Sequence, residues 1–248
     1  MKSIEILYQD SNIVVINKPS GVLVIPDRHT YENKTLVGIL KKQLGQKIWV
    51  VHRIDRETTG VVVFAKNAQA HKRLSMQFEH SQVSKKYIAL LSGVIEDEEA
   101  QINKPVLVSD SRVEIDPSGK ESITDYKVLE RFKGYTLVQA IPKTGRRHQI
   151  RIHFWSLGHP LAIDKDYGSG QPILLSQIKR NYKEKSTRQE KPLIDRLTLH
   201  AAQLTLTLPD CQEERDFVSD SDNKTKTFAA PLPKDFEIAL KQLRKYGK

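Results

Sequence analysis

The sequence predicts an α+β fold in which a mixed, mainly antiparallel β-sheet forms the core and helices flank it. Short apolar runs that end at turn residues recur along the chain, as they do in strands. Between them lie a few segments with apolar residues at helical spacing. The chain has 248 residues, of which 38% are hydrophobic and 28% charged, which is ordinary for a globular protein with a substantial core.

The first part of the chain predicts four strands and one helix. Residues 4–8 and 12–17 are two strands, and the turn sequence Lys18-Pro19-Ser20-Gly21 ends the second. A helix is expected over 35–44, because its apolar residues fall at positions i, i+3, i+4 and i+8. Residues 48–51 and 61–65 are two more strands, so the peptide between them is expected to be a loop held at both ends by the core.

The rest of the chain continues the mixture of strands and helices. A second helix is expected to begin at Asn67 and a third at Thr144, the latter with Ile150, Phe154 and Leu157 facing inward. Gly158 is expected to end the third helix, and a final helix covers 234–246. Strand patterns occupy 85–93, 101–108, 121–130 and 134–142, and a further one starts at Leu197.

Residues 1–248 are expected to form a single domain, because the chain shows no internal repeat, low-complexity tract or useful linker. Residues 164–195 are polar and basic, with no clear core stripe, and are interpreted as an insertion or a mobile arm. Residues 210–227 are charged and poor in apolar side chains, so exposed hairpin turns are expected there.

The balance of charge indicates the kind of partner. Lysine and arginine number 40 against 30 aspartates and glutamates, giving a net charge of +10. Such a charge favours binding to a polyanionic partner. Nucleic acid is the first candidate for that partner and an anionic membrane surface the second. The single Cys211 excludes an internal disulfide and a cysteine-based zinc cluster. With no apolar leader and no run of 18 uncharged apolar residues, a cytoplasmic protein is expected, without a membrane partner.

The peptide His52-Arg53-Ile54-Asp55-Arg56-Glu57-Thr58-Thr59-Gly60 places one carboxylate between two arginines. Nearby cations favour the ionised form of a carboxyl group, so Asp55 is expected to be available as a nucleophile or a base. The alternative interpretation is that Asp55 is a turn or capping residue, bonded to nearby backbone amides.

A second concentration of charge spans residues 143–153, with Lys143, Arg146, Arg147 and Arg151 beside two histidines. Cations in the first turn of a helix oppose the helix dipole, so they cost stability unless an anion compensates. A phosphate or a catalytic carboxylate would supply that anion. A solvated charged face is the plainer alternative.

Two further segments carry function-like residues. Tyr87, in the strand that begins near Lys85, is either a half-buried strand aromatic or a stacking surface for a flipped base with a phenol that relays a proton. Residues 180–191 place basic side chains around Tyr182, which would suit RNA backbone contacts, although a merely solvated loop would look similar. These basic residues are Arg180, Lys183, Lys185, Arg188 and Lys191.

Taken in order, these motifs resemble the RluA family of RNA pseudouridine synthases, from about Ile6 to Pro209. His52 to Gly60 is similar to the family's His-Arg-Leu-Asp-Arg-x-Thr-Ser-Gly signature, and Lys85-x-Tyr87 to its Lys-x-Tyr strand. Thr144 to Arg151 is similar to its Thr-Gly-Arg-x-His-Gln-Ile-Arg segment. The segments Gly158-His159-Pro160, Tyr167-Gly168 and Leu199-His200-Ala201 follow in register. An S4-type RNA-binding module is not expected before Tyr8.

The resemblance implies the pseudouridine synthase fold and isomerisation of specific uridines in structured ribosomal or transfer RNA, without cofactor or metal. It implies that Asp55 is the catalytic carboxylate, which attacks C1′ of the ribose or removes the 2′ proton. Arg151 would be its ion-pair partner, and Tyr87 would pack on the uracil and help to remove the C5 proton. A monomer is expected. The RNA contacts are expected from Arg53, Arg56, Lys85, Arg146, Arg147, His148, Arg180 and Lys183.

Three other functions share features with this sequence. A protein-kinase catalytic loop also begins His-Arg, but Ile54 separates Arg53 from Asp55 and the required Asn and Gly-rich loop are absent. A metal-independent ribonuclease could use His52, His148 and His153, since paired histidines can share the acid and base roles. The third is a non-catalytic RNA-binding protein that keeps the same surface.

Overall fold

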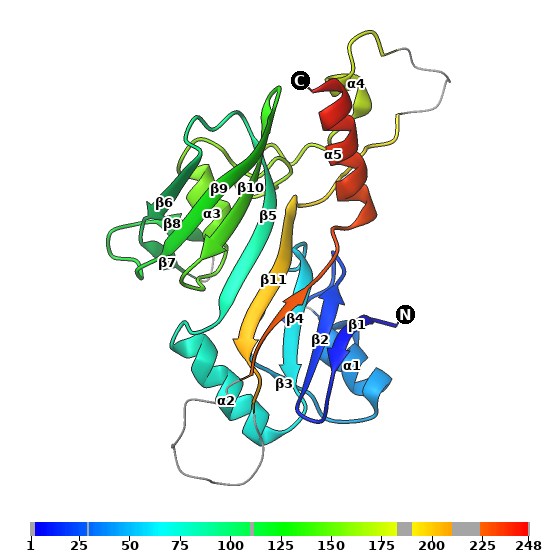
Figure 1. Ribbon diagram of the computed structural model, residues 1–248, viewed down its shortest axis with the longest axis vertical. Helices are drawn as coiled ribbons and strands as arrows, with labels where there is room; N and C mark the ends of the chain where they lie inside the picture. The colour runs from blue at the N-terminus through cyan, green and yellow to red at the C-terminus, as the bar shows by residue number, and fades with distance from the viewer. Residues whose placement is uncertain (1–2, 29, 110–111, 183–189, 210–223, 248) are drawn as a thin grey trace. The chain divides into compact units, whose positions relative to one another are not determined.

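The computed structural model describes residues 3–28, 30–109, 112–182, 190–209 and 224–247. The chain divides into two compact units (Figure 1). Unit 1 comprises Met1–Lys85 and Ala201–Pro231, and unit 2 comprises Lys86–His200 and Leu232–Lys248. Each unit is a β-sheet with helices packed on it, so the predicted α+β class with a mainly antiparallel sheet is confirmed. That the units act as one domain stays a prediction.

Unit 1 is built on the strand order β1-β2-β4-β11, with β12 paired to β11 and β3 paired to β4. The pairs β1–β2, β2–β4, β3–β4 and β11–β12 are antiparallel. The strands are β1 (Glu5–Gln9), β2 (Ile13–Lys18), β3 (Trp49–Val50), β4 (Thr59–Ala65), β11 (Leu199–Thr207) and β12 (Thr225–Ala229). The boundary with unit 2 falls within β11, after His200.

One helix covers each face of the unit 1 sheet, because the apolar side chains of β2 alternate between the two faces. Val14 and Ile16 pack with Leu36 and Leu40 of α1 (Leu36–Leu44). On the other face, β2 and β4 pack with Ala70 and Leu74 of α2 (Ala68–Glu79). Both helices are capped by side chains where the sequence predicts their starts, at Thr35 and Asn67. A short 3-10 turn, η1 (Glu32–Lys34), precedes α1.

Unit 2 carries the antiparallel strand order β5-β10-β9-β6 and a separate hairpin, β7–β8. The strands are β5 (Ser84–Ser92), β6 (Glu99–Asn103), β7 (Val106–Val108), β8 (Val113–Ile115), β9 (Ile123–Phe132) and β10 (Tyr135–Pro142). The single strand predicted over 101–108 is wrong, because two strands in different sheets share that segment. Pro105 stands between them and has no N–H to donate to a ladder.

The unit 2 sheet is also covered on both faces. Ile150 and Phe154 of α3 (Gln149–Trp155) pack on one face with β5, β9 and β10. Phe236 and Leu240 of α5 (Lys234–Tyr246) pack on the other with Leu90 of β5. Helix α5 has the predicted bounds. The hairpin β7–β8 packs on α3 through a small cluster of Val106, Val113 and Ile152.

Helix α3 begins at Gln149, so the predicted start at Thr144 is wrong. The side chain of Gln149 holds the preceding residues in turns: its Oε1 accepts from the Thr144 hydroxyl at 2.8 Å and from the Arg146 N–H at 3.0 Å. The cations at 143–147 therefore precede the helix and do not occupy its first turn. Leu157 lies beyond the helix and is 37% exposed, contrary to prediction, whereas Gly158 ends the segment with φ +81° as expected.

The predicted insertion is joined to the core of unit 2 at both ends. Ile173 and Ile194 are buried and form an isolated β-bridge with each other, and a short helix, α4 (Leu175–Ile178), follows the first of them. Residues 183–189 lie outside the described part, so the mobile-arm interpretation stays a prediction. Of the predicted hairpin turns at 210–227, residues 210–223 lie outside the description, and Thr225 onward is strand β12 instead.

No helix among the described residues is long and apolar enough to span a membrane.

Candidate active site

The loop that carries Asp55 is fixed by a buried lysine. Lys18, at the end of β2, is completely buried, and its ammonium donates to three backbone carbonyls. These are the oxygens of Pro19 at 2.9 Å, Arg56 at 2.6 Å and Thr58 at 2.9 Å. The Thr58 N–H donates back to the Asp55 carbonyl at 3.2 Å, which closes the turn. The half-buried Asp55 is thus presented by a turn tied directly to the core strand β2.

His52 fixes the other end of this loop. Its Nε2 accepts a hydrogen bond from the Val63 N–H of β4 at 3.0 Å, and its ring stacks on Phe78 of α2 at 4.5 Å. Burial, with the nearby charge of Lys85, lowers the pKa of His52 from 6.5 to about 3. The imidazole is therefore neutral at physiological pH and acts as a structural acceptor.

The end of the loop requires glycine. Gly60 has φ +110°, and a Cβ placed there would lie 2.1 Å from the carbonyl oxygen of Ala201 in β11. The arginines on either side of Asp55 are both exposed. Arg56 donates through Nε to the Gly21 carbonyl at 3.0 Å, so its guanidinium lies along the loop surface. Exposure of Arg53 and Arg56 agrees with the RNA-contact prediction, which stays untested.

Lys85 and Tyr87 lie at the start of β5, on either side of the boundary between the units. Tyr87 is half-buried in unit 2, pairs with Ala140 of β10, and packs against the core cluster that contains Ile150 and Phe154. It is therefore a half-buried strand aromatic, as the plainer interpretation predicts, and its proposed contact with uracil stays a prediction.

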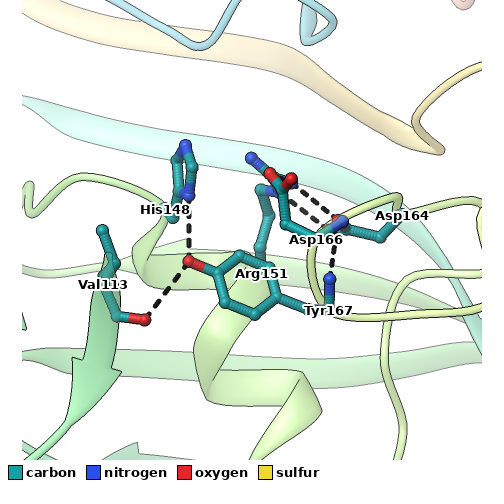
Figure 2. A network of polar contacts seen from close by, with 6 residues as sticks. All are labelled: Val113, His148, Arg151, Asp164, Asp166 and Tyr167. Atoms are coloured by element: carbon teal, nitrogen blue, oxygen red, sulfur yellow. Dashed lines mark hydrogen bonds and ion pairs between the residues drawn. The ribbon is translucent and has the colours of Figure 1, made fainter. Parts of the chain in front are cut away.

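Arg151 is the centre of a polar cluster in unit 2 (Figure 2). The residue is 7% exposed, and its guanidinium makes a bidentate contact with Asp164, from Nε to Oδ2 at 2.7 Å and from Nη2 to Oδ1 at 2.6 Å. Nη2 also donates to Asp166 Oδ2 at 2.6 Å, and the ring of Tyr167 lies 5.0 Å from Cζ. The hydroxyl of Tyr167 is 2.9 Å from His148 Nδ1.

Asp164 organises this cluster. It is completely buried, and its Oδ1 accepts from the backbone N–H groups of Asp166 and Tyr167 at 2.9 and 3.2 Å. Burial alone would raise the pKa of Asp164, but the hydrogen bonds and charge of Arg151 outweigh it, and the net pKa is below the ordinary value. Burial raises the pKa of Tyr167 to about 12, against the opposing charge of Arg151. Asp164 is an anion and Tyr167 a neutral phenol at neutral pH.

The remaining residues predicted to contact RNA differ in their exposure. Arg146 is half-buried and donates through Nε to the Glu121 carbonyl at 3.2 Å, while Arg147 is exposed. Arg180 is exposed after α4, and Lys183 lies outside the described residues. Asp55 and Arg151 belong to different units, and their predicted ion pair stays a prediction.

The histidines do not support ribonuclease chemistry. His52 is held neutral by burial, as described above. His153 is completely buried between the Thr124 hydroxyl at Nδ1 and the Lys104 carbonyl at Nε2, both at 3.0 Å, and burial lowers its pKa. Both rings are structural, which leaves His148 without a second histidine of the predicted set to share acid and base roles.

Sequence reasoning missed the residues that support the predicted site. From the sequence, Lys18 belongs to a turn, and the motifs indicate no role for Asp164 or Asp166. One signal was present: an aspartate that directly follows the apolar run Leu161-Ala162-Ile163 is expected to be buried, and a buried carboxylate needs a cation. Tyr167 was noted only as part of a motif.

The comparisons with known proteins agree with this architecture. Residues 12–156 match the RNA pseudouridylate synthase family. The chain is 32% identical to ribosomal large subunit pseudouridine synthase D of Nitrosomonas europaea, over 97% of this chain and 65% of that protein. It is 34% identical to tRNA pseudouridine synthase C of Pasteurella multocida, over 86% of this chain and 89% of that protein. The solved structure of human RNA pseudouridylate synthase domain containing 4 superposes with a TM-score of 0.71 at 27% identity, over 97% and 93% of the two chains.

The fold, the anchored aspartate loop and the family match define the class of this protein. The chain belongs to the RNA pseudouridylate synthase family. Within that family its relatives include the ribosomal large subunit synthases C and D, so the resemblance to RluA-type enzymes is confirmed. The chain spans 65% of the length of the first of these relatives and 70% of the second.

Proposed function

We propose that this chain isomerises specific uridines to pseudouridine in ribosomal or transfer RNA. The observation that carries the proposal is the Asp55 loop, which has the family's signature and is anchored by buried Lys18 and neutral His52. Relatives named as ribosomal large subunit and transfer RNA synthases support the two RNA classes. The net charge of +10 supports binding to a polyanion.

The reaction breaks the bond between N1 of uracil and C1′ of ribose, turns the base, and forms a bond between C5 and C1′. A stacked uridine must first be flipped out, at a cost of a few kcal/mol that contacts to the RNA backbone offset. Asp55 either attacks C1′ or removes the 2′ proton, and in both routes the uracil departs with the electrons of the broken bond. As C5 forms its bond to C1′, the Asp55 carboxylate is displaced from C1′ in the first route and returns the proton to C2′ in the second. The C5 proton then leaves and N1 gains one, so the atoms of the RNA are conserved.

Three side chains take roles in this proposal. Asp55 is the catalytic carboxylate, and a rigid loop suits it because misplacement of a reacting group is costly. Tyr87 packs on the uracil and helps to remove the C5 proton. Arg151 is assigned as the ion-pair partner of Asp55. The bidentate contact of Arg151 with Asp164 supports such a role, because it holds the guanidinium in one orientation.

Surface cations complete the proposal. We assign RNA backbone contacts to the exposed Arg53, Arg56, Arg147 and Arg180. The protein acts as a monomer in the cytoplasm, where ribosomal and transfer RNA are accessible. The chemistry needs no metal or cofactor, because proton transfers and one carboxylate suffice.

The test uses large-subunit ribosomal RNA and pooled transfer RNA, transcribed with tritium at C5 of uridine. The proposal expects release of tritium to water, unchanged RNA length, and pseudouridine among the nucleosides after digestion. Shortened RNA would indicate a ribonuclease instead. Binding of both RNAs without tritium release would indicate a non-catalytic RNA-binding protein, and either outcome would overturn the proposal.

A further inference from the structure

Unit 2 contains two arginine–aspartate pairs of the same geometry. Arg151 contacts Asp164 through Nε at 2.7 Å and Nη2 at 2.6 Å. Arg196 contacts Asp235 through the same atoms at the same two distances. The two arginine side chains are also similarly buried, with exposed fractions of 8% and 12%. The bidentate contact alone therefore does not distinguish Arg151 from an ordinary structural arginine.

Arg151 carries restraints beyond this shared contact. Tyr167 places its ring over the guanidinium, with Cζ 5.0 Å from the ring centroid. Each arginine also makes a third hydrogen bond, from Arg151 Nη2 to Asp166 Oδ2 at 2.6 Å and from Arg196 Nη1 to the Leu197 carbonyl at 3.3 Å, so the ring is what distinguishes them. Among the residues that the structure describes, no aromatic ring lies over Arg196. A bidentate carboxylate fixes the guanidinium along one edge, whereas a ring across its face opposes rotation out of that plane.

Tyr167 is itself held at both ends. Its backbone N–H donates to Asp164 Oδ1, and its hydroxyl is bonded to His148 Nδ1, with the two rings nearly perpendicular at 87° (Figure 2). The hydroxyl also donates a longer hydrogen bond, at 3.5 Å, to the Val113 carbonyl. His148 immediately precedes α3 and has φ 55°, a left-handed conformation that is uncommon outside glycine. Strained backbone of this kind persists where the surroundings fix it, and here it places the imidazole against the tyrosine hydroxyl.

We propose that Tyr167, anchored by His148, is a positioning residue for Arg151. The ring restricts rotation of the guanidinium, so that the cation meets its catalytic partner in one orientation. The part of the inference that concerns catalysis rests on the proposed function. His148 then acts on Arg151 through Tyr167, a role different from the RNA contact predicted for it.

The direct test is rotation about the Nε–Cζ bond of each arginine, measured by ¹⁵N exchange NMR on the whole chain without RNA. Arg151 is expected to rotate more slowly than Arg196 in the unsubstituted protein. Tyr167→Leu removes the ring and its hydroxyl, so it speeds rotation of Arg151 at least about 3-fold and leaves Arg196 unchanged. Equal rates for the two arginines, or no response of Arg151, would overturn the inference.

Two substitutions at His148 separate the anchor from the strained backbone. Asn and Gly both tolerate positive φ, but only Asn keeps a polar atom close to the position of Nδ1. His148→Gly removes the hydrogen bond between position 148 and the tyrosine hydroxyl and leaves only the longer contact with the Val113 carbonyl, so it is expected to speed rotation of Arg151, though less than Tyr167→Leu does. His148→Asn is expected to restore slow rotation. Equal behaviour of the Gly and Asn variants would contradict the anchoring role.

Activity is measured as the single-turnover rate constant for tritium release from saturating RNA. Tyr167→Leu is expected to lower it about 10- to 100-fold, with RNA affinity and the unfolding midpoint little changed. Tyr167→Phe and His148→Gly keep the ring and lose its hydrogen bond to position 148, so their rate constants are expected to lie between those of the unsubstituted protein and Tyr167→Leu. Tyr167→Phe also keeps the packing and so guards against a folding defect. Weaker RNA binding with an unchanged rate constant would make these residues RNA contacts and overturn the inference.

The two proposals fail differently. If the unsubstituted protein released no tritium, the proposed function would fail, and the rotation rates would still decide whether Tyr167 and His148 position Arg151. If tritium were released but rotation did not respond to Tyr167→Leu, the function would stand and the positioning role would not.

Discussion

A buried lysine ties the Asp55 turn to the core of unit 1. Lys18 is completely buried, so its ammonium must be compensated by polar groups, and three carbonyls of the turn and its neighbour provide them. A cation that gathers carbonyl oxygens in this way orders the backbone without contacting the substrate.

Lys18→Met keeps the length and apolar stem of the side chain but removes the donors to these carbonyls. We expect a loss of about 2 kcal/mol or more in the free energy of unfolding, because hydrogen bonds to a charged donor are lost inside the protein. Urea unfolding followed by tryptophan fluorescence measures it. Lys72→Met, at an exposed site in α2, is the matched control and should change little. An equal effect of both substitutions would contradict this role for Lys18.

His52 predicts a particular dependence of stability on pH. Its pKa is about 3 in the folded chain and 6.5 ordinarily, so the unfolded chain binds more protons between these values. The free energy of unfolding therefore rises with pH through this window. The contribution of His52 to it is fully present above pH 6.5 and is lost as the solution is acidified towards pH 3.

His52→Gln tests this dependence, because Gln can accept the Val63 N–H but does not titrate. Urea unfolding at about pH 7.5 and about pH 5 should show a larger loss for the unsubstituted chain than for the variant. His153 and the carboxylates remain in both proteins, so their contributions cancel in the difference. Parallel losses would show that His52 does not titrate as described.

The aspartate motif and the identity of Arg151 could be predicted from the sequence, because both stand in motifs with fixed spacing. The roles of the histidines could not. A histidine in a charged peptide suggests acid–base chemistry, but His52 and His153 are directed by packing into backbone hydrogen bonds. The partners of Arg151 were also hidden, since Asp164 and Tyr167 approach it only when the turn after Ile163 folds against α3.

At the scale of elements, hydrophobic periodicity predicted most strands and helices, including α1 and α5 at nearly their observed bounds and the start of α2. It failed where side chains override periodicity. Gln149 bonds to Thr144 and Arg146, which delays the start of α3, and Pro105 divides one predicted strand into two. The strands β8 and β12 were missed because short strands in polar surroundings carry little apolar pattern.

The end of the Asp55 loop depends on the close approach of β4 and β11. Gly60 and Gly134 both have positive φ, but only Gly60 faces a backbone oxygen where a Cβ would stand. Gly60→Ala should cost about 2–4 kcal/mol of unfolding free energy, and Gly134→Ala about 1 kcal/mol from backbone strain alone. Thermal and urea unfolding measure both. Equal costs would mean that β4 moves aside without penalty.

The charge of the whole molecule predicts how RNA binding depends on salt. With a net charge of +10, binding should release counterions from the RNA phosphates. The logarithm of the binding constant should therefore fall linearly with the logarithm of the salt concentration. Arg180→Glu, an exposed cation in the predicted insertion, should weaken binding of transfer RNA and reduce the slope by about 1 or more.

Lys42→Glu, at an exposed site on α1, is the matched charge reversal. For this variant, the slope of the binding constant against salt concentration should stay closer to that of the unsubstituted chain. Equal changes for the two variants would mean that the insertion makes no specific RNA contact and that net charge alone sets the affinity.

For the whole molecule, we propose that Asp55 performs the isomerisation on RNA bound by the surrounding surface. The most direct measurement is tritium release from C5-labelled ribosomal and transfer RNA by the unsubstituted chain and by Asp55→Ala, at RNA concentrations that saturate both. We predict release by the first, none by the second, and RNA affinities within about 3-fold of each other, since the half-buried carboxylate contributes to chemistry more than to binding. Tritium release by Asp55→Ala at an undiminished rate would contradict the account.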